Sequence, residues 1–252
     1  MFSLVDFIFP KKCVGCSKFG AYFCEDCFGK IEFVENPVCP VCQRQAVGGK
    51  THPGCASRLG LDGLVVACRY RGPVKAAIAK VKYKWIYDIG EVLADLLVAN
   101  LWRFSLPNDY ILVPIPLHFR RKNWRGFNQA ELLAKILSQR FNVSKANILV
   151  RNRETKTQVG LKRDERIENM RGAFSITPTR HPEPIRSEPH VIDSGVAQTR
   201  GGRRLDSGSS VKGQKFLLVD DVFTSGATMM EAAKILKKAG ARSVWAMVVA
   251  LG

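Results

Sequence analysis

The chain has 252 residues, of which 46% are hydrophobic and 24% are charged, and its formal net charge is +17. This hydrophobic content supplies a buried core for one sizeable domain or two smaller ones, which argues against an intrinsically disordered protein. A cationic surplus of this size favours polyanionic partners, either nucleic acids or multiply phosphorylated small molecules.

The N-terminal stretch and the apolar runs determine the predicted localisation. No uninterrupted apolar run approaches the length of a membrane span. The first residues, MFSLVDFIFPKK, lack the basic start and the small-residue cleavage site of a signal peptide. The sequence therefore predicts a cytoplasmic protein without a membrane span.

Cysteines are concentrated near the N-terminus, where seven of the eight lie within residues 13–55. In a cytoplasmic protein, closely spaced cysteines indicate metal ligands rather than disulfides. A two-residue gap lets two side chains reach one tetrahedral ion, and two such turns complete its four ligands. The candidate ligands, enough for two zinc ions, are Cys13, Cys16, Cys24, Cys27, Cys39, Cys42, His52 and Cys55.

Two pairings use these eight ligands. Neighbouring turns can share an ion, which makes two consecutive zinc ribbons, or the first turn can share an ion with the third in a cross-braced arrangement. A full set of protein ligands leaves no open position for a catalytic water, so we expect structural sites. So small a segment lacks an adequate core, and metal binding has to supply its folding energy. We predict a double zinc ribbon over residues 1–60.

A strand and two helical segments follow the cysteines. The stretch GLVVACRYRG, which starts at Gly63, is typical of a strand. Residues 69–84 carry six basic residues and no acidic one. A solvated helix face and an electrostatic track for nucleic acid explain this run equally well. Residues 89–101 have the apolar spacing of an amphipathic helix.

Residues 109–115 predict a second strand, which leads into a strongly cationic loop. Arg120, Arg121 and Arg125 stand in this loop. Cations between a strand and a helix can neutralise a diphosphate group, so we expect these arginines to face the diphosphate of a ligand. Asn128 is a suitable N-cap for the helix that follows.

Residues 215–236, KFLLVDDVFTSGATMMEAAKIL, have the pattern of a ligand site. The apolar run 216–219 predicts a strand buried on both faces, and Asp220 and Asp221 follow where this strand opens into a loop. The loop can aim backbone N–H groups and hydroxyls at a phosphate beside a helix N-terminus. The carboxylates can hold ribose hydroxyls, directly or through a metal ion. The loop residues are Thr224, Ser225, Gly226, Ala227 and Thr228.

Three stretches resemble known families. Residues 215–236 are similar to the phosphoribosyl-diphosphate signature of type I phosphoribosyltransferases, in which the acid pair contacts the ribose and the loop encloses the 5′-phosphate. PIPLHFRRKNWRGFNQAELLA, residues 114–134, and RNRETKTQVGLKRDERIENMRGAF, residues 151–174, resemble the ComF family. These are bacterial proteins linked to DNA uptake, which place zinc ribbons before a phosphoribosyltransferase domain.

The resemblance implies an α/β fold, with a type I phosphoribosyltransferase-like, mainly parallel sheet flanked by helices over residues 61–252. It implies phosphoribosyl diphosphate with Mg²⁺ as the ligand, and Asp220 and Asp221 as the catalytic pair. It also implies that residues 151–174 form a flap over the diphosphate. Residues 178–213 are rich in Pro, Gly, Ser and Arg and predict a flexible insertion.

Two functions are compatible with this sequence. In the first, the chain binds phosphoribosyl diphosphate and acts in DNA uptake and natural competence, with single-stranded DNA and DNA-uptake proteins as partners. In the second, it is an active phosphoribosyltransferase that transfers ribose 5-phosphate to a nitrogenous base or a related acceptor. No residue type or spacing specifies an acceptor.

Overall fold

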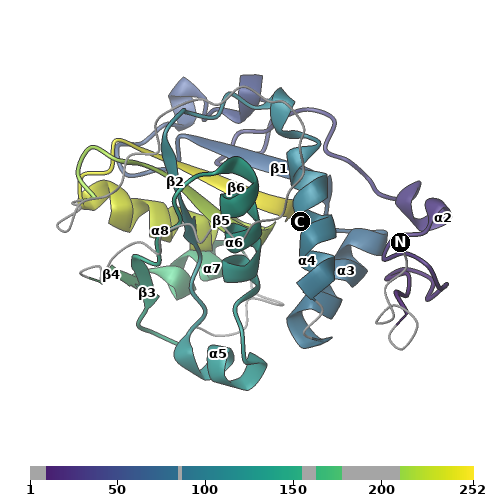
Figure 1. The fold of residues 1–252 in the computed structure, drawn as a ribbon. Coiled ribbons are helices and arrows are strands. Elements are labelled where there is room, and N and C mark those ends of the chain that lie inside the picture. The colour runs from purple at the N-terminus through teal and green to yellow at the C-terminus, as the bar shows by residue number, and fades with distance from the viewer. Residues whose placement is uncertain (1–9, 85–86, 155–162, 178–210) are drawn as a thin grey trace.

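The computed structural model describes residues 10–84, 87–154, 163–177 and 211–252. Its centre is a parallel sheet with the strand order β1-β6-β5-β2 (Figure 1). The strands are β1 (Gly63–Arg69), β2 (Tyr110–Pro114), β5 (Lys215–Phe223) and β6 (Ser243–Leu251). Because all four are parallel, their carboxyl ends meet at one edge of the sheet, where α/β proteins bind ligands.

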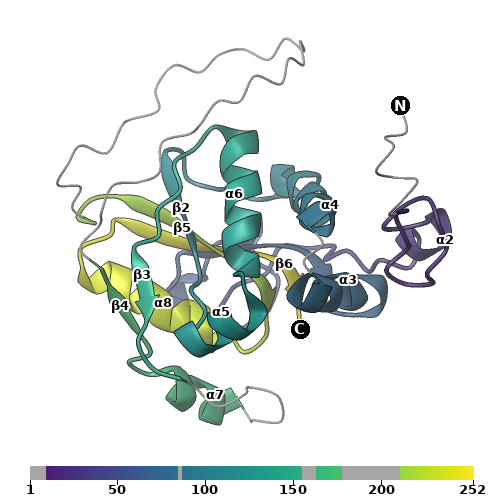
Figure 2. The same cartoon turned by 60° about the horizontal axis from the view of Figure 1, so that its bottom comes forward.

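Helices cover both faces of this sheet (Figure 2). One face packs against α3 (Gly72–Lys84), α4 (Tyr87–Val98) and α6 (Gln129–Phe141). The other packs against α8 (Ala227–Lys238), α7 (Arg163–Met170) and the antiparallel pair β3 (Leu149–Arg151) and β4 (Phe174–Ile176). Successive residues of β5 supply the two cores, since Leu217 faces the first layer and Leu218 the second. The predicted α/β architecture with a mainly parallel sheet is confirmed.

Strand β5 is longer than the sequence predicted. The apolar run predicted a strand that ends at Val219, with the acid pair in the following loop, and this end was placed wrongly. Strand β5 pairs with β6 as far as Phe223, because the main-chain ladder between them continues past the acid pair. Its pairing with β2 ends at Val219, opposite Pro114. Asp220 and Asp221 therefore lie within a strand, just beyond the end of β2.

Both edges of the sheet are covered. At the outer edge of β1, the backbone N–H of Val34 donates to the carbonyl oxygen of Ala67 over 2.9 Å. At the outer edge of β2, Leu112 donates to Ser144 and accepts from Ala146, each over 2.9 Å. Covered edges protect the sheet from pairing with another chain.

Short helices complete the described part of the chain. They are α2 (Glu25–Phe28), α5 (Phe119–Arg125) and the 3-10 helices η1 (Val47–Gly49), η2 (Pro53–Cys55) and η3 (Leu101–Arg103). The predicted cap of α6 is confirmed, since the side-chain oxygen of Asn128 accepts from the N–H of Ala130 over 3.1 Å. No helix in the described residues is long and apolar enough to cross a membrane.

Two predicted segments fall largely outside the described residues. The predicted insertion, 178–213, is described only from residue 211 onward. The predicted flap, 151–174, is described on either side of residues 155–162. Its described parts contain the last residue of β3, the whole of α7 and the first residue of β4.

The close contact between β1 and β6 gives a test of the sheet. A Cβ atom at Gly63 would lie 2.5 Å from the ring of Trp245, its partner across the two strands. We expect Gly63→Ala to lower the free energy of unfolding by about 1–3 kcal/mol, because the buried indole has no room to move. Urea unfolding followed by circular dichroism measures this change. Gly54→Ala is the control, since no atom lies within 4 Å of its added Cβ. Equal losses in both variants would contradict this packing.

Candidate functional site

The first cysteine cluster consists of Cys13, Cys16, Cys24 and Cys27, whose sulfur atoms all lie within 4.8 Å of one another. The sulfur atoms of Cys16 and Cys24 are 3.5 Å apart. Burial alone would raise the pKa of Cys13, but backbone N–H groups, led by that of Cys24, lower it to about 6. The thiolate of Cys13 in turn raises the pKa of Cys27 to about 12.

The second cluster consists of Cys39, Cys42, His52 and Cys55. The Sγ atom of Cys42 lies 3.3 Å from Nδ1 of His52. The other ring nitrogen, Nε2, lies 2.9 Å from the carbonyl oxygen of Gln45. A carbonyl oxygen only accepts, so Nε2 carries the proton and Nδ1 is left to face the cluster. This is the arrangement in which histidine binds a metal ion.

These clusters decide between the two pairings that the sequence left open. Neighbouring turns meet in each cluster, so the ribbons are consecutive and the cross-braced arrangement is wrong. Four sulfur ligands in one cluster, and three with an imidazole nitrogen in the other, suit tetrahedral Zn²⁺. The backbone N–H of Arg44 lowers the pKa of Cys42 to about 6, which favours the thiolate that binds metal. The two clusters fit two structural zinc ions.

The two ribbons attach to different parts of the sheet domain. The first, with α2, projects beside α3 and α4 (Figures 1 and 2), and the hydroxyl of Tyr22 donates to Asp88 over 3.0 Å. The second joins the core on the α8 side, where Val38 is buried. Its Gln43 side chain donates to the carbonyl oxygen of Thr224 over 2.9 Å. The second ribbon therefore touches the loop that the sequence assigned to a phosphate.

The acid pair lies near the carboxyl end of β5 and is half-buried. The N–H of Asp221 donates to the carboxylate of Asp220 over 2.9 Å. The amide of Gln129, the first residue of α6, donates to Asp221 over 3.4 Å and accepts from Arg125 over 3.4 Å. Gln129 thus connects a predicted diphosphate-binding arginine with the acid pair, and the sequence analysis missed it because it looks like an ordinary first helical residue.

The loop after β5 forms a tight turn into α8. Gly226 precedes the helix with a left-handed φ of 77°, and an added Cβ atom would lie 2.6 Å from the ring of Phe223. Only glycine meets both conditions without strain. Ala227 and Thr228 begin α8, so their backbone N–H groups are at the positive end of a twelve-residue helix. The five predicted loop residues are contiguous with the acid pair at the same sheet edge.

The three predicted arginines of residues 119–125 have different surroundings. Arg120 pairs with Glu154 over 2.7 Å, and both side chains are largely exposed, so this pair stabilises the fold little. Arg125 contacts Gln129, as above. Arg121 acts electrostatically on Arg151, the last residue of β3.

Arg151 is a buried cation that the sequence analysis did not select. It ends β3 and is 9% exposed. Burial, followed by repulsion from Arg121, lowers its pKa to about 10, while attraction to Asp220 opposes this shift. The guanidinium group is still protonated at neutral pH. Arg151, Arg121 and Asp220 therefore form one electrostatic group, although they come from β3, α5 and β5.

His118 is another buried polar residue of this region. It precedes α5, is 4% exposed, and its ring centre lies 4.4 Å from that of Phe119. Within the described residues its Nδ1 atom has no hydrogen-bond partner. The sequence analysis did not count this histidine among the site residues.

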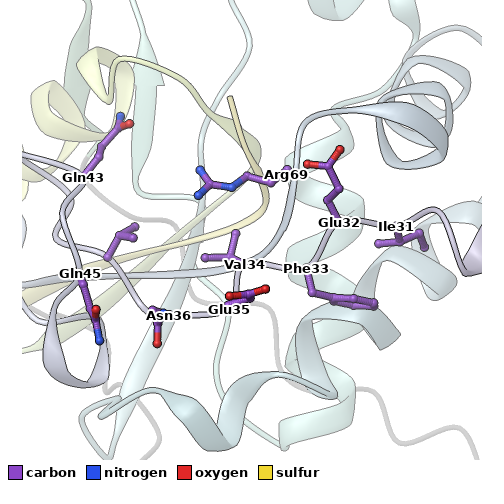
Figure 3. Close-up of a pocket in the computed structure, with 10 residues that line it drawn as sticks. Ile31, Glu32, Phe33, Val34, Glu35, Asn36, Gln43, Gln45 and Arg69 are labelled. Atoms are coloured by element: carbon purple, nitrogen blue, oxygen red, sulfur yellow. The ribbon is translucent and has the colours of Figure 1, made fainter.

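A cavity of about 670 Å³ adjoins the second ribbon. Its wall is formed by residues 31–36, Val38, Gln43, Gln45 and Arg69. Arg69 is the last residue of β1, so the cavity opens at the carboxyl edge of the sheet. Figure 3 shows its guanidinium group pointing away from Glu32, toward the side that carries Gln43. Gln43 therefore contributes to the cavity wall and also contacts the loop after β5.

Comparison with known proteins gives two family matches. Residues 4–56 match the double zinc ribbon domain, and residues 128–252 match the phosphoribosyl transferase domain. These two matches cover both cysteine clusters, the acid pair and the loop after β5.

Curated relatives match most of the chain. Competence protein F of Haemophilus influenzae is 27% identical over 243 residues, which cover 88% of this chain and 93% of the relative. DNA utilization protein YhgH of Escherichia coli O157:H7 is 27% identical over 231 residues, covering 82% and 87%. Competence protein ComFC of Streptococcus pneumoniae is 25% identical over 224 residues, covering 88% and 84%. The chain therefore combines a double zinc ribbon with a phosphoribosyltransferase domain, and these relatives confirm the predicted resemblance to the ComF family.

Proposed function

We propose that this chain binds phosphoribosyl diphosphate at the carboxyl edge of its sheet and uses this site in the handling of single-stranded DNA during DNA uptake. The ribose hydroxyls contact Asp220 and Asp221, and the 5′-phosphate binds the loop of residues 224–228. Arg121 and Arg125 face the diphosphate. Arg120 pairs with Glu154 at the protein surface, and it reaches the ligand by giving up this ion pair for one with the diphosphate.

The hydrogen-bonded connection from Arg125 through Gln129 to Asp221 is the observation that carries this proposal, because it joins a predicted diphosphate-binding arginine to the acid pair. Arg151 adds a buried cation to this region, and burial followed by repulsion from Arg121 lowers its pKa to about 10, while attraction to Asp220 opposes this shift. A bound diphosphate would add negative charge beside these arginines in a place shielded from water, where each charge-assisted hydrogen bond is strong.

We expect Mg²⁺ to bind together with phosphoribosyl diphosphate, and not at a site made of protein side chains alone. In the described residues, clusters of three or more metal-binding side chains occur only at the two cysteine sites. Mg²⁺ is usually held by one or two carboxylates together with substrate phosphates and water. Asp220 and Asp221 would supply such carboxylates, and the ion would neutralise diphosphate charge. The protein residues would orient the ribose and the phosphates around it.

The role in DNA uptake is supported by the relatives and by the charge of the chain. The three relatives described above are named as competence or DNA utilization proteins. A net charge of +17 favours binding to a nucleic-acid backbone. Helix α3 contributes Lys75 and Lys80 to this charge, and it lies beside the first ribbon (Figure 2).

The cavity beside the second ribbon favours a second candidate function, an active phosphoribosyltransferase. A transferase needs room for an acceptor next to the ribosyl group. The cavity has the volume typical of small-molecule sites. Gln43 lies in its wall and contacts Thr224, the first residue of the proposed phosphate loop, residues 224–228. The carboxylates of Glu32 and Glu35 in its wall would accept hydrogen bonds from a nitrogenous base.

Metal content tests the role of the ribbons. We expect about two zinc ions per chain in the wild type, measured by atomic emission after dialysis against a weak chelator. Cys42→Ala should retain one zinc ion, because it removes a ligand of the second cluster. Cys68→Ala should retain both, because this buried cysteine belongs to neither cluster. Two zinc ions in Cys42→Ala would show that Cys42 is not a ligand.

Isothermal calorimetry tests the ligand site. We expect Asp220→Asn and Asp221→Asn each to weaken binding of phosphoribosyl diphosphate with Mg²⁺ by about 10-fold to 100-fold, the loss expected for charged hydrogen bonds. Asp109→Asn makes the same charge change at the amino end of β2, where its left-handed φ of 56° suits asparagine. It should bind as the wild type does. Identical affinities in all four proteins would refute the assignment of the acid pair.

A third experiment separates the two functions. Release of diphosphate is measured with phosphoribosyl diphosphate and a panel of nitrogenous bases, and binding to single-stranded DNA is measured at several salt concentrations. We expect no release with any base, and an affinity for DNA that falls steeply with salt because counterions are released. Base-dependent release of diphosphate would favour the transferase. DNA binding that does not change with salt would contradict an electrostatic DNA-binding role.

A further inference from the structure

Gln43 connects the Cys39–Cys42 turn of the second cluster with the phosphate loop. The backbone of Gln43 is part of this turn. It directly follows Cys42, and its φ of 57° is left-handed. Its N–H donates to the carbonyl oxygen of Cys39 over 2.9 Å, and the N–H of Cys39 donates to Arg44 over 2.9 Å. The direction in which the side chain of Gln43 points therefore depends on how Cys39 and Cys42 are held together.

The side chain of Gln43 reaches a residue that is distant in the sequence. Its Nε2 atom donates to the carbonyl oxygen of Thr224 over 2.9 Å, and the contact is partly buried. Thr224 is the first residue after β5 and begins the turn that ends at Gly226. The ribbon thus holds the phosphate loop at a backbone atom, so the contact does not depend on the side chain of Thr224.

Holding this carbonyl group also fixes a hydrogen-bond donor. A trans peptide unit is planar, and its C=O and N–H groups point in opposite directions. The described residues contain no cis peptide bond. When Gln43 holds the carbonyl oxygen of Thr224, the N–H of Ser225 is consequently directed to the side away from the ribbon. The backbone N–H groups of this loop are the donors proposed for the phosphate.

We propose that Gln43 is a positioning residue that couples zinc binding at the second cluster to phosphate binding at the loop of residues 224–228. Zinc fixes the Cys39–Cys42 turn, the turn orients Gln43, and Gln43 orients the peptide between Thr224 and Ser225. By linkage, the ligand then tightens zinc binding by the same factor as zinc tightens ligand binding. This proposal rests on the proposed ligand site and adds a regulation of it.

The zinc chemistry of the second cluster is compatible with such a role. The cluster lies at the protein surface, with Cys42, His52 and Cys55 only partly buried. His52 is held by the backbone of Gln45, two residues from Gln43. Removal of the ion would release the thiolates of the turn from one another, and the orientation of Gln43 would no longer be fixed.

The test measures two affinities in the full-length, zinc-loaded protein. Binding of phosphoribosyl diphosphate with Mg²⁺ is measured by calorimetry, and zinc affinity is measured by competition with a chromogenic chelator with and without this ligand. In the wild type we expect the ligand to tighten zinc binding by about 3-fold to 10-fold, the range that corresponds to one net hydrogen bond. Gln43→Ala should weaken ligand binding by a similar factor and abolish the effect of ligand on zinc.

Gln45→Ala is the matched control, because it removes the same side chain from the same ribbon and the same cavity wall while leaving the contact with Thr224 intact. It should behave as the wild type does. A second variant, Gln43→Glu, keeps the size of the side chain but replaces its donor, and it should lose the coupling as Gln43→Ala does.

The outcomes separate this proposal from the one on which it rests. If the wild type binds the ligand but Gln43→Ala retains the coupling, Gln43 has no positioning role. The same conclusion follows if ligand leaves the zinc affinity of the wild type unchanged. If the wild type does not bind the ligand at all, the proposed ligand site is wrong and the coupling with it. Exchange of the Ser225 amide hydrogen, measured without ligand, should be faster in Gln43→Ala than in Gln45→Ala, and equal rates would also contradict the positioning role.

Discussion

Strand β5 pairs with β6 over more residues than with β2, and this difference determines the geometry around the acid pair. Pairing with β6 continues to Phe223, whereas pairing with β2 ends at Val219. The residues between these points are fixed by main-chain hydrogen bonds on one side, and in the part of the chain that the structure describes they have no neighbouring strand on the other. The acid pair occupies this stretch, beside the start of α6 and the chain that leads into α5. The strand presents Asp221 to the start of α6, where Gln129 contacts it, and Asp220 to the side of Arg151.

The zinc ribbons contribute to this arrangement in different ways. The first is attached at the side of α3 and α4, where the hydroxyl of Tyr22 donates to Asp88. The second packs in the same core as α8 and contacts the phosphate loop through Gln43. Because metal supplies the folding energy of so small a unit, the geometry of the second ribbon depends on zinc. The proposed ligand site and the second cysteine cluster are therefore parts of one structure.

The sequence predicted those features that carry a local pattern. The spacing of the cysteines indicated eight metal ligands, the acid pair followed by TSGAT indicated a phosphate loop, and Asn128 indicated a helix cap. The end of β5 was misplaced because aspartate is unfavourable in strands, and pairing with β6 outweighs that local preference. The spacing of the turns was equally compatible with two pairings of ligands, which the fold resolved.

The residues missed by the sequence analysis acquire their roles only in three dimensions. Arg151 ends a three-residue strand far from the acid pair in the sequence, and only its burial beside Arg121 and Asp220 marks it as part of the site. Gln43 is a common polar residue after a cysteine, and its contact with Thr224 spans most of the chain. No periodicity or spacing reveals such contacts, because they depend on how the ribbon packs against the sheet.

A crystal structure of the zinc-loaded protein with phosphoribosyl diphosphate and Mg²⁺ would test the central claim most directly. The account predicts the 5′-phosphate at the loop of residues 224–228, the ribose hydroxyls at Asp220 and Asp221, and the diphosphate between residues 119–125 and Arg151. A ligand bound at another place, such as the cavity beside Arg69 alone, would contradict it.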